Sequence, residues 1–252
     1  MSRINIPSII KSCLQSLGAI FTGVKFFLQT PLVWSYVFVA VLLNILSVIL
    51  TVLIVVFGLT LTVNFIVTAL QVSVAPAVAM IVYVLIILLG ILVAALLFNI
   101  LSSIVTAPIY GKLAEVMTIR EFGEHLGPSQ SVWQELILSI SFQAKKSVLI
   151  FGFLLLSLPL NLIPSIGQVA FLLINLTQLV LITGLDLYEP ILNRQKLNFR
   201  GKLAYILARP TELWPFLLIS GLVCSIPIIN ILTIPICTVA AILYSRRLNS
   251  SG

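Results

Sequence analysis

The sequence predicts an all-α integral membrane protein: two long transmembrane helices plus two re-entrant (half-penetrating) helical hairpins and amphipathic surface helices. Two observations on composition place it in the membrane, because 60% of the 252 residues are hydrophobic and only 8% are charged. A soluble chain carries roughly 25% charged residues, so this sequence has too few to cover a water-facing surface. A third observation, the position of prolines inside apolar stretches, predicts the hairpins.

The charged residues gather in four clusters, separated by charge-free stretches at 26–111, 147–185 and 213–245. The formal net charge is +7, and lysine and arginine close to span ends favour the cytoplasmic side of a membrane. Full crossings in pairs and re-entrant hairpins both return the chain to the side where it began. We therefore expect a multi-pass protein with its charged loops and both termini in the cytoplasm.

We expect a single membrane domain over 1–252. An amphipathic helix over 1–30 comes first, and two long spans follow within 31–106, at about 33–57 and 79–106. Each is long enough, because a helix needs about 20 apolar residues to cross a bilayer. The uncharged link between the two spans is expected to lie along the far interface, since exposed backbone cannot stop within lipid.

The rest of the chain alternates polar and apolar segments. These are a cytoplasmic helical segment at 107–146, a first hairpin at 147–186, a cytoplasmic surface helix at 187–212 and a second hairpin at 213–245. Asp186 ends a long apolar arm, where a carboxylate lining an anion path would repel its cargo. We expect it to pair with Arg200 or Arg209.

Proline positions argue for hairpins rather than full spans. Pro164, closely followed by Gly167, leaves arms of about 17 residues, and Pro227 leaves arms of about 14 and 18, because proline breaks a helix. At 1.5 Å per residue, a 14-residue arm rises only ~21 Å, which is short of a ~30 Å hydrocarbon core. Full crossings by both arms remain the alternative, because the charge distribution would be the same.

The two hairpins also resemble each other at a constant sequence offset. Phe153, Leu154, Leu155, Ser157, Pro164 and Ile166 correspond to Phe216, Leu217, Leu218, Ser220, Pro227 and Ile229. Interrupted apolar segments at corresponding positions indicate a substrate site in transport proteins. The alternative is a chance likeness between two leucine-rich segments.

The returning arm of each hairpin provides candidate anion contacts. It begins near Gly167 and Gln168 in the first hairpin and near Asn230 in the second. A helix start leaves backbone N–H groups unpaired and carries the positive end of the helix dipole, which suits an anion. Ser165, Gln168 and Asn230 add side-chain donors. These four residues are candidate substrate-binding residues, and the alternative is that they only cap the turns.

Several stretches resemble one known family. The runs LIPSIGQVAFLL, GLDLYEPILNRQKLNFRGKLAYILARP and FLLISGLVCSIPIINILTIPICTVAA are similar to the C-terminal half of CysZ-type sulfate permeases, whose superfamily includes the etoposide-induced membrane proteins. The segment TAPIYGKLAE and the opening at 18–44 fit as well. The resemblance implies a bacterial inner (plasma) membrane permease or channel for an inorganic anion such as sulfate. It also implies a homo-oligomer.

One departure from that family concerns the cargo. Its sulfate permeases usually carry adjacent arginines just after the turn that opens the first span, where an arginine fork would bind an oxyanion through two hydrogen bonds. This chain has Trp34 and Ser35 there, following Thr30, Pro31 and Leu32. The resemblance makes Thr30, Pro31 and Leu32 candidate substrate contacts, while the identity of the anion stays open.

Other classes of function find little support in the sequence. It contains no phosphate-binding Gly-x-x-x-x-Gly-Lys-Ser/Thr loop, and Cys13, Cys224 and Cys237 lack metal-ligand or redox spacing. We expect no enzyme activity, no catalytic or metal site, no cofactor and no nucleic-acid partner. The alternative to a permease is a membrane scaffold or assembly factor of the same superfamily, which the missing arginine pair favours.

Overall fold

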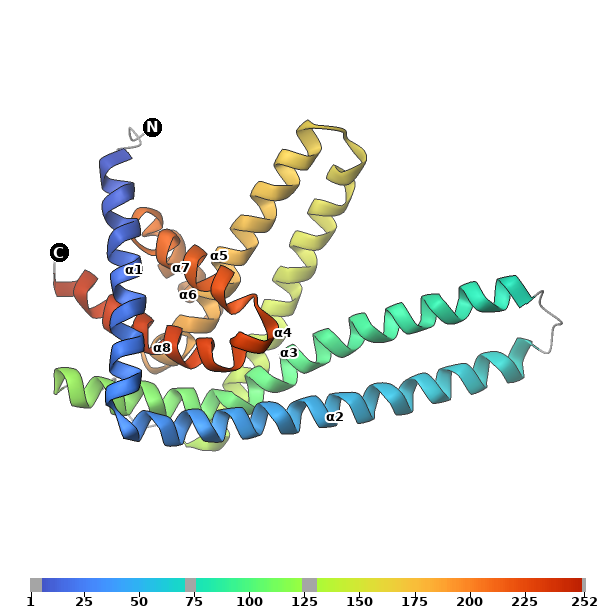
Figure 1. The fold of residues 1–252 in the computed structure, drawn as a ribbon, viewed down its shortest axis with the longest axis horizontal. Coiled ribbons are helices and arrows are strands. Elements are labelled where there is room, and N and C mark those ends of the chain that lie inside the picture. Colours follow the sequence, from blue (N-terminus) through green and yellow to red (C-terminus); the bar gives the residue numbers. More distant parts are fainter. Residues whose placement is uncertain (1–5, 71–75, 124–130, 251–252) are drawn as a thin grey trace. The chain divides into compact units, whose positions relative to one another are not determined.

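The computed structural model describes residues 6–70, 76–123 and 131–250, and within these ranges it is helical almost throughout, without a strand (Figure 1). The predicted all-α class is confirmed. The elements are α1 (Ile6–Gln29), α2 (Pro31–Leu70), α3 (Pro76–Phe122), α4 (Val132–Ser157), the 3-10 helix η1 (Leu158–Leu162), α5 (Ile166–Arg194), α6 (Phe199–Leu207), α7 (Pro210–Cys224) and α8 (Pro227–Ser250).

The chain divides into two compact units. The first contains Met1–Val39 and Ala107–Gly252, and the second contains Ala40–Thr106. Helices α2 and α3 contribute residues to both units. Each of these helices is longer than the predicted span it contains. The residues of the candidate functional site belong to the first unit.

The second unit is built from the apolar parts of α2 and α3. Asn44 and Ser102 are joined by a hydrogen bond between their side chains, and Gly90 faces Leu59. These two contacts pair early residues of one helix with late residues of the other, so the two helices are antiparallel. Most large apolar side chains here are exposed, as expected for helices that face lipid.

Within the described residues, four helical stretches are long and apolar enough to cross a membrane. They are Val33–Phe65, Met80–Arg120, Val132–Leu162 and Ile166–Arg194. The chain is therefore a multi-pass membrane protein by length and composition. The second of these stretches continues past the expected boundary at residue 106, because α3 remains helical through Pro108 and ends only at Phe122.

Helices α4 and α5 are longer than the arms expected for the first hairpin. They contain 26 and 29 residues, and the latter rises ~44 Å at 1.5 Å per residue. From the sequence, each arm is expected to end at a charged residue, at Lys146 or at Asp186. The structure instead keeps both residues inside helices, where their charges are paired within the protein. Arm length thus allows a full crossing by each of these helices.

The second hairpin has a short first arm. Helix α7 contains only 15 residues, and α8 begins at Pro227, where the sequence predicted the break. Helix α6 meets α7 at a bend of 103°. The predicted surface helix at 187–212 is divided in the structure, because its first residues still belong to α5 and α6 covers only the middle part.

Small residues allow close helix contacts in the first unit, where α1 packs on α7 and α8 and α5 packs on α7 (Figure 1). A Cβ atom placed on Gly23 of α1 would lie 2.8 Å from the Cβ of Ala240 in α8. A Cβ on Gly221 of α7 would lie 2.6 Å from the Oγ1 of Thr183 in α5. Such small-residue contacts are typical of helix pairs in membranes, where backbones approach closely.

The turn between η1 and α5 is unusually tight. Ser165 has φ 64° and ψ −74°, and the Ile166 N–H donates to the Pro164 carbonyl oxygen at 2.8 Å. This is a γ-turn with a positive φ at its centre, a strained conformation for any residue except glycine. Gly167 is buried directly behind the turn, where a Cβ atom would collide with the carbonyl oxygen of Leu160.

We predict that Ser165→Gly stabilises the protein by about 1 kcal/mol, because glycine adopts this conformation without the strain that serine carries. Thermal unfolding in detergent measures the change. Gln168→Gly, in the first turn of α5, is the matched control and is expected to lower stability by roughly 0.5–1 kcal/mol. An equal loss of stability in both variants would show that the turn is not strained.

Candidate functional site: a buried ionic network and a lysine-lined pocket

Helix α4 buries polar side chains and exposes apolar ones. It begins at a capping box, in which the Ser131 Oγ accepts from the Gln134 N–H. From there the buried polar or charged residues recur at helical spacing and so share one face. They are Glu135, Ser139, Gln143 and Lys146. This arrangement is the reverse of a soluble amphipathic helix and places a polar face in the protein interior.

Arg194, at the end of α5, joins α3 to α4. Its side chain is only 2% exposed, and its Nη2 donates to the Gly111 carbonyl oxygen at 3.1 Å and to Glu115 Oε2 at 3.0 Å. Glu135 Oε1 lies 3.5 Å from the same nitrogen. A Cβ atom on Gly111 would lie 2.6 Å from Glu135 Oε1, so glycine leaves the space that this carboxylate occupies. Two carboxylates therefore share one guanidinium.

A second ion pair lies farther along α4 and α5. The Lys146 Nζ donates to Asp186 Oδ1 at 2.7 Å, and the lysine side chain is 2% exposed. The expectation that Asp186 pairs with Arg200 or Arg209 is therefore wrong. Helices α4 and α5 pack together, so the partner of Asp186 comes from the facing helix and not from the polar segment that follows it in sequence.

A third group links α5 to α6. The Lys202 Nζ donates to Asn193 Oδ1, and it also lies 4.3 Å from the centroid of the Phe142 ring. The Asn193 Nδ2 donates to Glu189 Oε1 at 3.4 Å. The buried cation is thus connected to a buried carboxylate through an amide. Helix α6 starts beside this group. The Asn198 side chain caps the helix by accepting a hydrogen bond from the Gly201 N–H.

Some buried polar groups near these pairs have no partner. Among the residues that the structure describes, none hydrogen-bonds to Ser139 Oγ or to either amide atom of Gln143. The Nε and Nη1 of Arg194 are likewise without a partner. An unsatisfied buried polar group costs about 1–3 kcal/mol, so each of these groups needs an explanation. They supply hydrogen-bond donors that the ion pairs do not use.

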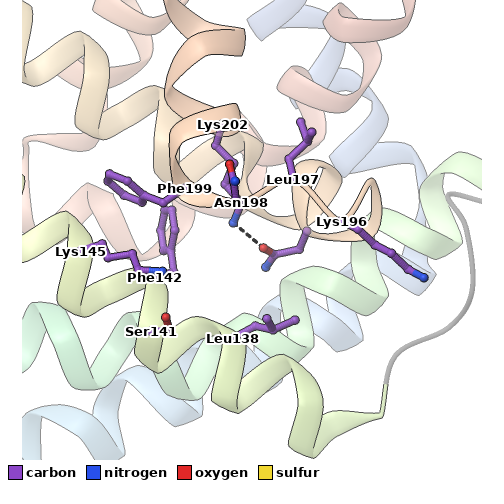
Figure 2. A pocket seen from close by; sticks show the side chains of 10 residues that line it. Leu138, Ser141, Phe142, Lys145, Lys196, Leu197, Asn198, Phe199 and Lys202 are labelled. Atoms are coloured by element: carbon purple, nitrogen blue, oxygen red, sulfur yellow. Dashed lines mark hydrogen bonds between the residues drawn. The ribbon is translucent and has the colours of Figure 1, made fainter.

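A pocket of about 330 Å³ lies where α4 meets α6 and the segment before it. Its polar lining comprises Lys145, Lys196, Lys202, Ser141, Asn193 and Asn198. In Figure 2, Lys145 and Lys196 lie on opposite sides, and Lys202 lies between them. Lys145 and Lys196 are exposed, and neither forms an ion pair with a carboxylate within the described residues.

The predicted site residues lie in two places in the first unit. Ser165 and Gln168 are exposed at the tip formed by η1 and α5, with Gly167 buried behind them. Thr30 is buried at the break between α1 and α2, where its carbonyl oxygen accepts from the Val33 N–H at 3.0 Å, and Pro31 follows it. Figure 1 shows the tip and this break well apart.

Two predicted site residues, Leu32 and Asn230, have side chains outside the described part of the protein. The ionic network and the lysine-lined pocket were not predicted. The recurrence of Glu135, Gln143 and Lys146 at helical spacing would have indicated a polar face on α4. The sequence instead led us to expect these residues in a cytoplasmic helical segment at 107–146.

Comparison with known proteins identifies the family. The chain matches the family described as "Sulfate transporter CysZ/Etoposide-induced protein 2.4" over residues 19–235. The chain belongs to this family. The resemblance found in the sequence is thereby confirmed, and the matched region includes the ionic network and the pocket. No curated protein matches the chain.

The position at which sulfate permeases of this family usually carry adjacent arginines has a different role here. The Trp34 Nε1–H donates to the Phe27 carbonyl oxygen at 3.1 Å, and the rings of these two residues lie 5.0 Å apart. Trp34 therefore ties the start of α2 to the end of α1. It supplies packing and a hydrogen bond at a position where the resemblance implies a cation.

We predict that Arg194→Met destabilises the protein by about 3–5 kcal/mol, because it leaves two carboxylates without their shared cation. Unfolding in a denaturant titration of the detergent-solubilised protein measures the loss. Adding Glu135→Gln to this variant is expected to restore part of the stability. Arg200→Met, at an exposed position in α6, is the control and is expected to change stability by less than about 0.5 kcal/mol. Similar losses for the two arginines would contradict a structural role of the network.

Proposed function

We propose that this protein is a permease or channel for a small inorganic anion, with sulfate as the first cargo to test. Membership of a family described by a sulfate transporter supports the class of cargo. The observation that carries the proposal is the set of buried donors without partners on and beside the polar face of α4. In a membrane protein, polar groups at such positions line substrate paths or water-filled cavities.

Hydrogen-bond donors without partners support an anion as cargo. The Lys146–Asp186 pair is neutral, and Glu115 and Glu135 share the Arg194 guanidinium, so each of these carboxylates is in contact with a cation. The free donors are the Gln143 amide nitrogen, the Ser139 hydroxyl and two nitrogens of Arg194. Donors of this kind bind an oxyanion through hydrogen bonds.

The proposed topology keeps both hairpins of the sequence analysis. Helix α7 rises only ~22 Å over its 15 residues, which supports a re-entrant second hairpin. Helices α4 and α5 are long enough to cross, and both arrangements return the chain to the same side. Lysine and arginine at the helix ends support a cytoplasmic location for the charged loops and both termini, in the bacterial inner membrane. Assembly as a homo-oligomer follows from the family resemblance.

Three breaks are proposed as further anion contacts, namely the two hairpin breaks identified in the sequence and the break that the family resemblance indicates. They comprise Ser165, Gly167 and Gln168 at the α5 tip, Thr30, Pro31 and Leu32 between α1 and α2, and Asn230 near the start of α8. The close packing behind Gly167 favours a structural role for that residue, because no side chain fits there. Ser165 and Gln168 are exposed and so remain accessible to an ion.

We predict that a cysteine introduced by Ser165→Cys reacts with a membrane-impermeant thiol reagent, and that sulfate slows the reaction. The background is a variant in which Cys13, Cys224 and Cys237 are replaced by alanine. Asn230→Cys tests the second hairpin in the same way. The rate of labelling in proteoliposomes, with sulfate against gluconate, is the measurement. If sulfate leaves the labelling rate unchanged at both positions, the hairpin tips do not line the path of the anion.

Transport itself is tested with a variant that separates stability from flux. Gln143→Leu removes an amide that has no partner, so it is expected to leave stability unchanged or raise it. If the amide contacts the ion, sulfate flux into proteoliposomes falls about tenfold, as expected for the loss of one hydrogen bond to a charged group. Gln15→Leu, at an exposed position in α1, is the control and is expected to transport normally.

The alternative function is a membrane scaffold or assembly factor of the same family. The observation that favours it is the structural use of Trp34 at the position of the family's arginines. The flux assay separates the two functions, because a scaffold leaves liposomes closed to sulfate, sulfite and chloride under every gradient. If one stoichiometric partner is recovered in mild detergent and the liposomes stay closed to these anions, the permease function is rejected and the scaffold function is supported.

A further inference from the structure

We propose that the lysine-lined pocket between α4 and α6 binds the phosphate head group of an anionic phospholipid. This inference is independent of the permease function, because the pocket and the free donors of α4 are different sets of residues. It concerns a binding site for a component of the surrounding membrane. The size of the pocket, its charge, the residues that line it and its position each support this proposal.

Three lysines line the pocket, and Lys145 and Lys196 lie on opposite sides of it (Figure 2). Lys202 is buried and committed to Asn193 and to the Phe142 ring. Lys145 and Lys196 are exposed, and within the described residues no carboxylate lies within 4.0 Å of either. The lining therefore carries positive charge that the protein does not neutralise. A phosphate group would neutralise it.

The backbone at Lys196 indicates that this lysine has a role beyond the fold. It follows α5 with φ 55°, its N–H donates to the Asn193 carbonyl oxygen at 3.0 Å, and the Leu197 N–H donates to the Leu192 carbonyl oxygen at 3.2 Å. These are the two hydrogen bonds of a Schellman motif, in which the left-handed position is usually glycine. A lysine there is strained, and this residue lines the pocket.

The volume and lining favour an amphipathic ligand over a bare ion. A water molecule occupies about 30 Å³ of liquid volume, so an ion built from a few atoms fills only a small part of 330 Å³. Four apolar residues complete the lining, namely Leu138, Phe142, Leu197 and Phe199. A lining that combines lysines with apolar side chains matches a phosphate attached to a glycerol backbone and acyl chains.

The position of the pocket connects it to the surface that faces lipid. Leu138 lines the pocket and is also 43% exposed on the outside of α4. Ile137, the preceding residue, and Trp133, more than one turn earlier, are also exposed on this helix. Tryptophan is enriched at the membrane interface, at the depth of phospholipid head groups. Basic pockets between membrane helices are known to hold anionic head groups.

The test compares lipid binding to purified full-length variants by native mass spectrometry in detergent. Phosphatidylglycerol is expected to remain bound to the wild-type protein, and phosphatidylcholine is not. Lys145→Gln combined with Lys196→Gly is expected to weaken phosphatidylglycerol binding about 25-fold, at about fivefold for each lysine charge near an anionic head group. Glycine relieves the strained backbone at residue 196, so weaker binding cannot be attributed to unfolding.

The control is Lys25→Gln combined with Arg120→Gln, which removes the same charge at exposed positions outside the pocket. It is expected to bind phosphatidylglycerol within about twofold of the wild type, as surface charges far from a site contribute little. Equal binding by the lysine variant and this control would overturn the proposal. So would displacement of the lipid by millimolar inorganic phosphate, because the pocket would then be a site for a soluble oxyanion.

Discussion

The first unit depends on the burial of charged side chains as partners of one another. Arg194 holds Gly111, Glu115 and Glu135 at one end of α5, while Lys146 and Asp186 join α4 to α5 farther along. Taking a charge out of water costs several kcal/mol, and an opposite charge in close contact offsets this cost only when the geometry is good. The relative positions of α3, α4 and α5 are therefore constrained by charge pairing as much as by apolar packing.

This constraint explains which parts of the sequence argument succeeded. The helix breaks at Pro164 and Pro227 follow from the chemistry of proline, which is local, and both lie where they were expected. The membrane class and the family likewise follow from composition and from quoted motifs. These features need no knowledge of which segments meet in three dimensions.

The parts that failed all depend on tertiary partners. The sequence predicted that the first hairpin ends at Lys146 and Asp186, because an unpaired charge is costly in lipid. Each of these charges has a partner on the facing helix, so α4 and α5 extend past them. The pocket was missed for a similar reason, since Lys145 and Lys196 are far apart in sequence and line the same pocket only when α4 packs beside the end of α5. The sequence alone also does not show that the Gln143 amide lacks a hydrogen-bond partner, because this depends on the residues packed around it.

The contact between Gly23 and Ala240 has a consequence for biogenesis. Helix α1 is synthesised early and α8 late, yet the two backbones approach so closely that no larger side chain fits at the crossing. The ribosome must therefore translate α8 before α1 acquires this neighbour. Until then its glycine face is open to other membrane segments. A chain that is interrupted before α8 cannot close this crossing.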